Sequence, residues 1–234
     1  MKGKTVQLGK YSYNKEWHNG PFMTFVKKVL CKIALFYDYI WDLIICHCSL
    51  VKYVPSIYRE SLGGTGSQSS PYWVLDEIFC NITLTENDSF VDVGCGKGRV
   101  LAFLLRNKAK CSISGIELNE EVANYAKAWS KRYPNVTVLN ENAFEIDYNQ
   151  FTVLFLFRPF ETETFRKFIE KIEQEISHPI RFIYYADTQS GNLLKDRPGW
   201  LMKQRNWVWK KYGLYLSMIP QRWSEWTYTP IAKN

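Results

Sequence analysis

The chain has 234 residues, of which 46% are hydrophobic and 23% charged, with 9 Trp, 15 Tyr and 14 Phe. This length supports one substantial hydrophobic core and is too short for two full-size domains. The composition excludes a disordered, collagen-like or disulfide-dominated chain.

The net charge of +7 is unevenly distributed along the chain. Residues 1–60 carry +5 and residues 188–234 carry +6, whereas residues 61–187 carry −4. Two basic, aromatic-rich flanks therefore surround an acidic middle. Such flanks suit contact with an anionic partner, such as nucleic acid or a membrane surface, and are equally consistent with solvated surface Lys and Arg.

The N-terminal residues and the cysteines bear on the compartment. Residues 1–17 lack the apolar core and the cleavage site of a secretory signal, so we expect none. The six cysteines include no C-x-x-C pair, and free thiols suit a reducing cytoplasm. The string Cys46-His47-Cys48 suggests a metal site, but neighbouring residues project about 100° apart on a helix. We therefore expect a cytoplasmic protein without a bound metal.

The first long apolar segment spans residues 22–51. Its apolar run over residues 33–51 is almost long enough to cross a bilayer, but Asp38 and Asp42 near the centre would cost about 5–7 kcal/mol. On a helical projection the polar residues fall within one arc of roughly 140°, which is an amphipathic pattern formed by Lys27, Lys28, Lys32, Asp38, Asp42 and Ser49. We predict one or two helices packed on the domain. A membrane-surface helix, which would make the association peripheral, and a true span are the alternatives.

Residues 61–71 are rich in Gly and Ser and predict a loop. Pro71 suits the first turn of a helix over Tyr72–Cys80, with Ser70 as its N-cap. We place the boundary between an N-terminal helical extension, residues 1–60, and the main domain, residues 61–234, just before this loop.

Beyond this helix, short apolar runs alternate with amphipathic segments. The predicted strands are Ser89–Val93, Cys111–Leu118, Val136–Asn140, Phe151–Phe157 and Ile180–Ala186, and the predicted helices are Gly98–Asn107, Asn119–Arg132 and Glu161–Ile176. This alternation favours an open parallel sheet with right-handed crossovers. Two further strands, over 207–219 and 223–231, predict an antiparallel ending. The expected fold class is α/β: a Rossmann-like, mostly parallel seven-stranded sheet flanked by helices.

The most informative string is Phe90-Val-Asp-Val-Gly-Cys-Gly-Lys-Gly-Arg99, which joins a buried strand to a helix N-terminus through three glycines. Ligands of such sheets bind beyond the carboxyl ends of the strands. A dinucleotide-binding turn, G-x-G-x-x-G, would need a small residue at position 99. The string instead resembles motif I of the class I S-adenosylmethionine-dependent methyltransferases. This resemblance implies S-adenosylmethionine as the cofactor, contacted by Asp92, Gly94, Cys95 and Gly96.

Two further positions fit the same resemblance. Glu117 ends the next predicted strand about 20 residues beyond the turn, where an acid accepts hydrogen bonds from both ribose hydroxyls of a nucleoside. A helix N-terminal charge is the alternative role for Glu117. After the third strand, Glu141-Asn142-Ala143 stands where the family often has Asp and a small residue at the adenine edge, and Asn142 can both donate and accept. The implied cofactor contacts are therefore Glu117, Leu118, Asn142 and Ala143.

The string Phe155-Leu-Phe-Arg158-Pro159-Phe160 stands where some class I methyltransferases have Asn-Pro-Pro-aromatic or Asn-Pro-Phe, which holds an acceptor nitrogen. Arg158 departs from that pattern because it donates and cannot accept, so nucleobase amino methylation is not favoured. Arg158 is instead a candidate clamp for a substrate carboxylate or phosphate, or forms an ion pair with Glu161 or Glu163. Phe160 either walls the cofactor site or belongs to the core.

The loop before the first strand resembles the segment that closes over the cofactor in several such enzymes. That likeness implies contacts from Gln68, Ser69 and Tyr72, and a flexible linker is the alternative.

Methyl transfer is an in-line displacement that needs a base only for a hydroxyl or a protonated amine. The candidates at the strand ends are Asp187, Tyr184 and Tyr185. The function expected is a methyltransferase for an unidentified acceptor, for which Arg158 makes an anionic group a candidate. The alternatives are a nicotinamide-dependent Rossmann enzyme and a catalytically silent module that binds nucleic acid or a membrane surface.

Overall fold

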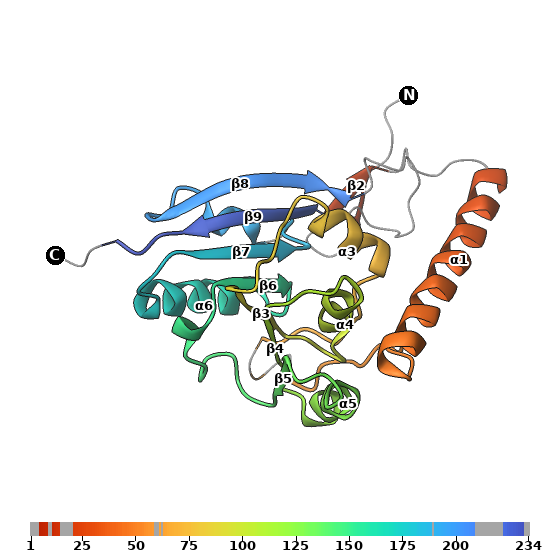
Figure 1. Cartoon of the computed structure of the whole chain (residues 1–234). Coiled ribbons are helices and arrows are strands. Elements are labelled where there is room, and N and C mark those ends of the chain that lie inside the picture. Colours follow the sequence, from red (N-terminus) through yellow and green to blue (C-terminus); the bar gives the residue numbers. More distant parts are fainter. Residues whose placement is uncertain are drawn as a thin grey trace.

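The computed structural model describes residues 5–8, 11–14, 21–58, 61, 63–188, 190–208 and 222–231. Its centre is a seven-stranded sheet of order β5-β4-β3-β6-β7-β9-β8, flanked by helices on both faces (Figure 1). The strands are β3 (Ser89–Val93), β4 (Ser112–Ile116), β5 (Val136–Leu139), β6 (Val153–Phe157), β7 (Ile180–Tyr185), β8 (Trp200–Trp207) and β9 (Arg222–Tyr228). The helices are α1 (Pro21–Cys46), α3 (Tyr72–Phe79), α4 (Arg99–Arg106), α5 (Glu120–Ser130) and α6 (Thr162–Glu175).

The pairing of the strands confirms the predicted topology. Strands β5, β4, β3, β6 and β7 are parallel to one another, and β9 runs antiparallel between β7 and β8. The carboxyl ends of β3, β4, β5 and β6 therefore meet at one edge of the sheet. This edge is where a ligand of an open α/β sheet binds.

The strand predicted over residues 207–219 falls almost entirely outside the described residues. The strand that pairs with β9 begins at Trp200 and ends at Trp207, and residues 209–221 lie outside the described part of the chain. β8 forms an edge of the sheet and exposes Leu201 and Met202, so it lacks the alternation on which sequence prediction depends.

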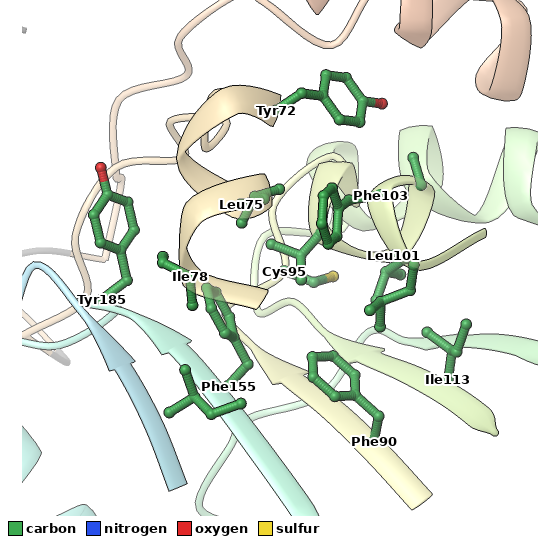
Figure 2. Packing of buried hydrophobic residues seen from close by; sticks show 14 of the residues in the cluster. Tyr72, Leu75, Ile78, Phe90, Cys95, Leu101, Phe103, Ile113, Phe155 and Tyr185 are labelled. Atoms are coloured by element: carbon green, nitrogen blue, oxygen red, sulfur yellow. The ribbon is translucent and has the colours of Figure 1, made fainter. Parts of the chain in front are cut away.

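The two faces of the sheet carry separate hydrophobic clusters because successive strand residues point to opposite sides. Phe90 and Phe155 belong to the cluster beneath α3 and α4, whereas Val91 and Leu154 belong to the cluster beneath α6. Figure 2 shows Phe90 and Phe155 pointing toward Ile78 of α3. The strands that carry the site are thus buried on both faces and held rigidly.

Helix α3 begins as predicted but is capped differently. Pro71, with an extended backbone conformation, is the N-cap, and no side chain of the preceding loop caps the helix. The N–H of Tyr72 instead donates to a carboxylate oxygen of Asp38 in α1 at 2.9 Å. The expected cap by Ser70 is therefore wrong, since a buried acidic residue from another helix fills that role.

The helical extension contains the single long helix α1, which lies beside α4 at the edge of the molecule (Figure 1). Its contact with the domain involves its acidic residues: Asp38 and Asp42 are buried against Arg99 of α4. Within the described residues, no helix is long and apolar enough to cross a membrane. The extension also contains a two-stranded antiparallel hairpin, β1 (Thr5–Leu8) and β2 (Tyr11–Asn14), which the sequence analysis did not predict.

Candidate functional site

The glycine-rich turn connects β3 to α4 at the carboxyl edge of the sheet. Its backbone has φ of +78° at Gly94, +56° at Gly96 and +86° at Gly98, a region that side chains other than glycine rarely adopt. A Cβ at Gly96 would lie 2.5 Å from the hydroxyl of Ser67. The turn therefore requires glycine both for its conformation and for the close approach of the loop that precedes α3.

Hydrogen bonds from β4 and α5 stabilise the glycine-rich turn. The N–H groups of Gly94 and Cys95 both donate to the carbonyl oxygen of Ile116 in β4. The indole of Trp129 in α5 donates to the carbonyl oxygen of Lys97 at 2.9 Å. These contacts fix the turn before any ligand arrives, which reduces the entropy cost of binding.

Glu117 follows β4 and meets the turn directly. Its carboxylate accepts a hydrogen bond from the Gly96 N–H at 2.9 Å and another from the Asn119 N–H at 2.9 Å. Burial raises the pKa of Glu117, and the hydrogen bonds from Asn119 and Gly96 partly oppose that shift. The carboxylate is thus oriented at the cavity wall, with further acceptor positions for ligand hydroxyls.

Asp92 is the second acidic residue in the cavity wall. Its side chain is buried, and within the described chain no hydrogen bond or ion pair to it is found. Burial, followed by the nearby charge of Glu117, raises the pKa of Asp92 well above its usual range. A buried acidic group without a protein partner is suited to a ligand that brings positive charge.

The turn after β5 supplies the part of the cavity wall next to Glu117. Asn142 and Ala143 both line the cavity. The Asn142 side-chain oxygen accepts the N–H of Phe144 at 3.1 Å, forming an Asx turn. The side-chain NH₂ of Asn142 is therefore the group left to donate to a ligand.

The segment after β6 brings Arg158 and Phe160 to the same cavity. Arg158 has φ of +38°, a strained value for a residue with a side chain. Thr65 stabilises this conformation: its N–H donates to the Pro159 carbonyl at 2.9 Å and its hydroxyl to the Arg158 carbonyl at 2.8 Å. Among the described residues, neither Glu161 nor Glu163 forms an ion pair with the Arg158 guanidinium, and Glu163 is paired with Arg166.

The described residues of the segment before α3, which are 51–58, 61 and 63–70, are called here the covering loop. Val54 and Ser67 exchange backbone hydrogen bonds of 3.0 and 2.8 Å, and Gly64 pairs with Phe160. Lys97 of the glycine-rich turn donates to the carbonyl oxygen of Lys52 at 2.8 Å. The covering loop is thus fastened both to the glycine-rich turn and to the segment after β6.

Together these elements enclose a cavity of about 400 Å³. Such a volume lies within the usual range for small-molecule and cofactor sites. Of the fourteen site residues expected from the sequence, the cavity brings together twelve: Gln68, Ser69, Asp92, Gly94, Cys95, Gly96, Glu117, Leu118, Asn142, Ala143, Arg158 and Phe160.

Two predicted site residues lie elsewhere. The ring of Tyr72 is buried beside the guanidinium groups of Arg99 and Arg106, at 5.5 and 5.7 Å, and does not line the cavity. Asp187 is fully buried, forms ion pairs with Arg205 and Arg222, and is also absent from the cavity wall.

The alternative bases, Tyr184 and Tyr185, are likewise outside the cavity. The Tyr184 hydroxyl is hydrogen-bonded to Ser190 at 2.7 Å, and the Tyr185 ring is buried against Phe157. Burial raises the pKa of the Tyr185 phenol further above its usual range, so this group does not ionise near neutral pH.

Sequence reasoning missed Tyr53 and Lys97, which also line the cavity. Lys97 lies inside the recognised string, between Gly96 and Gly98, but nothing in the sequence indicated that its side chain contacts the covering loop. Tyr53 stands in a segment without a recognised motif, so no signal pointed to it.

Comparisons with known proteins agree with this geometry. Residues 90–177 match the family model of a methyltransferase domain. No relative was found among curated protein sequences.

Solved structures share the fold at low sequence identity. An RNA methyltransferase from Salinibacter ruber, in complex with S-adenosyl-L-homocysteine, has a TM-score of 0.53 and 16% identity, covering 71% of this chain and 97% of its own. TrmK of M. capricolum, in complex with the same cofactor product, has a TM-score of 0.51 and 15% identity, covering 68% and 70%. MtNAS, in complex with MTA and tNA, has a TM-score of 0.52 and 14% identity, covering 89% and 76%.

Residues 90–177 therefore match a methyltransferase domain, and the sheet that contains them has the fold of solved structures that hold S-adenosyl-L-homocysteine.

Proposed function

We propose that the protein binds S-adenosylmethionine in the cavity at the carboxyl edge of the sheet and methylates an acceptor that carries a carboxylate or phosphate. The cofactor supplies a methyl group on a sulfonium sulfur, which is a good leaving group. The chain therefore has to bind, orient and desolvate rather than provide a nucleophile of its own.

The residues of the cavity fit this cofactor. Glu117 is held by the Gly96 N–H in a position suited to ribose hydroxyls, and the Asn142 amide group is available to an adenine ring nitrogen. Asp92 is a buried acidic group for which the described residues provide no partner, so it suits the positive charge that this ligand carries. Cys95 lines the cavity as a neutral thiol, since burial raises its pKa well above the usual range.

The single observation that favours an anionic acceptor is the state of Arg158. Its side chain is half-buried in the cavity wall, and no ion-pair partner for it is found among the described residues. A partly desolvated guanidinium is stabilised by a carboxylate or phosphate that it can bind in bidentate fashion. The strained backbone at Arg158, stabilised by Thr65, supports a positioning role for this segment.

Calorimetric titration with S-adenosylmethionine and with NADH tests the cofactor. We expect binding of the first and none of the second, and the absence of S-adenosylmethionine binding would overturn the proposal. The acceptor is sought by incubating the protein with labelled S-adenosylmethionine and fractionated carboxylates and phosphate esters.

Arg158→Met tests the acceptor contact. We expect this variant to keep the cofactor affinity and to lose methyl transfer to the anionic acceptor by about 10²-fold or more, as expected when a charged hydrogen-bonded pair is broken in a desolvated site. Arg166→Met, which removes an exposed guanidinium paired with Glu163, is the matched control. If Arg158→Met weakened cofactor binding instead, Arg158 would belong to the cofactor site and the anionic acceptor would lose its support.

A further inference from the structure

The outer face of α1 carries an exposed apolar stripe. Its members follow one another at intervals of three or four residues, so they lie on one side of the helix: Val29, Ile33, Phe36, Ile40 and Ile44. Ile33 is 57% exposed and Phe36 is 65% exposed. Monomeric soluble proteins rarely expose contiguous apolar surface of this kind, which is typical of a site of interaction.

The stripe exists because the polar side of α1 faces the protein. Asp38 and Asp42 lie on the opposite side of the helix and are buried on Arg99, whose guanidinium satisfies both carboxylates. The inward side also carries the apolar residues Trp41, Ile45 and Cys46, so α1 is apolar on both sides and its outward side departs from the usual polar pattern. The ion pairs fix this orientation, so the apolar side chains cannot turn inward without breaking a buried charge network.

Charge decides what kind of partner the stripe suits. The two acidic residues of α1 are both buried against Arg99, and the helix contains no other acidic residue. Lys32, whose side chain is described, is exposed, so the exposed surface of α1 combines apolar side chains with a positive charge. A second copy of α1 would bring only more lysine, whereas anionic lipid headgroups complement this charge.

We propose that α1 docks the protein on the surface of an anionic lipid membrane, with the stripe of Val29, Ile33, Phe36, Ile40 and Ile44 inserted at the headgroup boundary. The helix has 26 residues and is about 39 Å long, which is ample for an interfacial anchor lying in the membrane plane. The absence of a bilayer-spanning helix from the described residues makes this contact peripheral.

The experiment is co-sedimentation of the full chain with vesicles of phosphatidylcholine alone and of phosphatidylcholine mixed with phosphatidylglycerol. We expect binding to the mixed vesicles that weakens at high salt, and much weaker binding to phosphatidylcholine alone. The triple variant Ile33→Ser, Phe36→Ser, Ile40→Ser should lower binding to the mixed vesicles by at least about tenfold, since it removes the side chains that enter the interface.

Controls separate the stripe from general effects. Leu201→Ser removes a leucine that is equally exposed, at 58%, on β8, and should leave vesicle binding unchanged. The triple variant should keep the thermal unfolding midpoint and the S-adenosylmethionine affinity of the parent, because the replaced side chains are exposed and lie outside the cavity wall.

Two outcomes would overturn the proposal. One is a parent protein that stays in the supernatant with the mixed vesicles or binds them as well after the triple substitution. The other is a dimer, detected by light scattering, that the triple variant converts to a monomer, because the stripe would then be covered by a second copy. Neither outcome bears on cofactor binding, which is measured separately.

Discussion

Arg99 and Asp42 form a two-pronged ion pair inside the protein, with Nη2 at 2.6 Å from Oδ2 and Nε at 3.0 Å from Oδ1. The third nitrogen of the guanidinium, Nη1, donates to Asp38 at 3.2 Å. The remaining acceptors are also satisfied, since Asp42 accepts the Leu50 N–H and Asp38 accepts the Tyr72 N–H. Through Asp42 and Asp38, the first residue of α4 thus connects α1 with Leu50, just before the covering loop, and with the start of α3.

Asp42→Ala tests how much the buried ion pair with Arg99 contributes to the stability of the protein. Removing one partner leaves a buried guanidinium without its main counter-charge, so we expect the free energy of unfolding to fall by about 3–5 kcal/mol. The corresponding loss in Tm is roughly 10 °C for a chain of this size. Arg166→Ala breaks the exposed pair with Glu163 and should cost less than about 1 kcal/mol. Equal losses in the two variants, measured by denaturant and thermal unfolding, would contradict the buried role of Asp42.

Asp38, the second partner of Arg99, should make the free energy of unfolding depend on pH. Burial outweighs the attraction of Arg99 and raises the pKa of Asp38 from 3.8 to about 6. Because the folded pKa lies above the unfolded one, the contribution of this group to stability is fully present below about pH 4 and is lost as the pH rises through about 6. Asp38→Asn keeps an acceptor for the Tyr72 N–H without titrating.

Between about pH 4 and pH 7, the free energy of unfolding of the parent should therefore fall relative to that of Asp38→Asn by roughly 3 kcal/mol. Urea unfolding of both proteins across this range provides the measurement. A constant difference between them would show that Asp38 titrates at its ordinary pKa.

Glu117→Ala should weaken S-adenosylmethionine binding by at least about tenfold, since charge-assisted hydrogen bonds to the ligand are lost. The Gly96 and Asn119 N–H groups also lose their acceptor. Glu120→Ala removes an exposed carboxylate from the first turn of α5 and serves as the control for calorimetry. An unchanged affinity in Glu117→Ala would remove Glu117 from the cofactor site.

Asp92 should make cofactor binding depend on pH. Because the pKa of Asp92 is raised, a fraction of the ligand-free molecules keeps Asp92 protonated and neutral at pH values where an ordinary carboxyl group is ionised. A cationic ligand favours the ionised form. Affinity should therefore increase as the pH rises from acidic toward neutral, with release of a proton on binding.

Titrations in buffers of different ionisation enthalpy measure that proton directly. Asp92→Asn should bind more weakly than the parent at neutral pH and should lose the proton release. If the parent affinity were flat over about pH 5 to 8, Asp92 would not face the positive charge of the ligand.

The sequence predicted best those features that local residues determine. Strand β3 has the predicted bounds, since an apolar run ends there at a glycine turn. The ends of β4 and β5 follow from the same alternation, which is why Glu117 and Asn142 were correctly expected at one edge. Motif spacing thus sufficed to predict that these two residues line one cavity.

Features that depend on distant residues were not predictable in this way. The periodicity of α1 shows a polar arc, but only Arg99, 57 residues beyond Asp42, decides that this arc faces the protein. Asp187 follows β7 as expected, yet Arg205 and Arg222 of β8 and β9 enclose it in ion pairs. In both cases a cation from a remote element determines whether an acidic residue meets solvent, ligand or protein.

The ion pair between Arg99 and Asp42 also bears on how the protein can be divided. The loop that separates the helical extension from the main domain in the sequence is not a boundary between independent folding units, because a buried charge of one part is neutralised by the other. A shortened protein beginning after the extension would keep every strand of the seven-stranded sheet and would still leave the Arg99 guanidinium without Asp38 and Asp42 beside the glycine-rich turn. We therefore expect the segment with no recognisable motif to be required for the folded protein rather than to be a removable attachment.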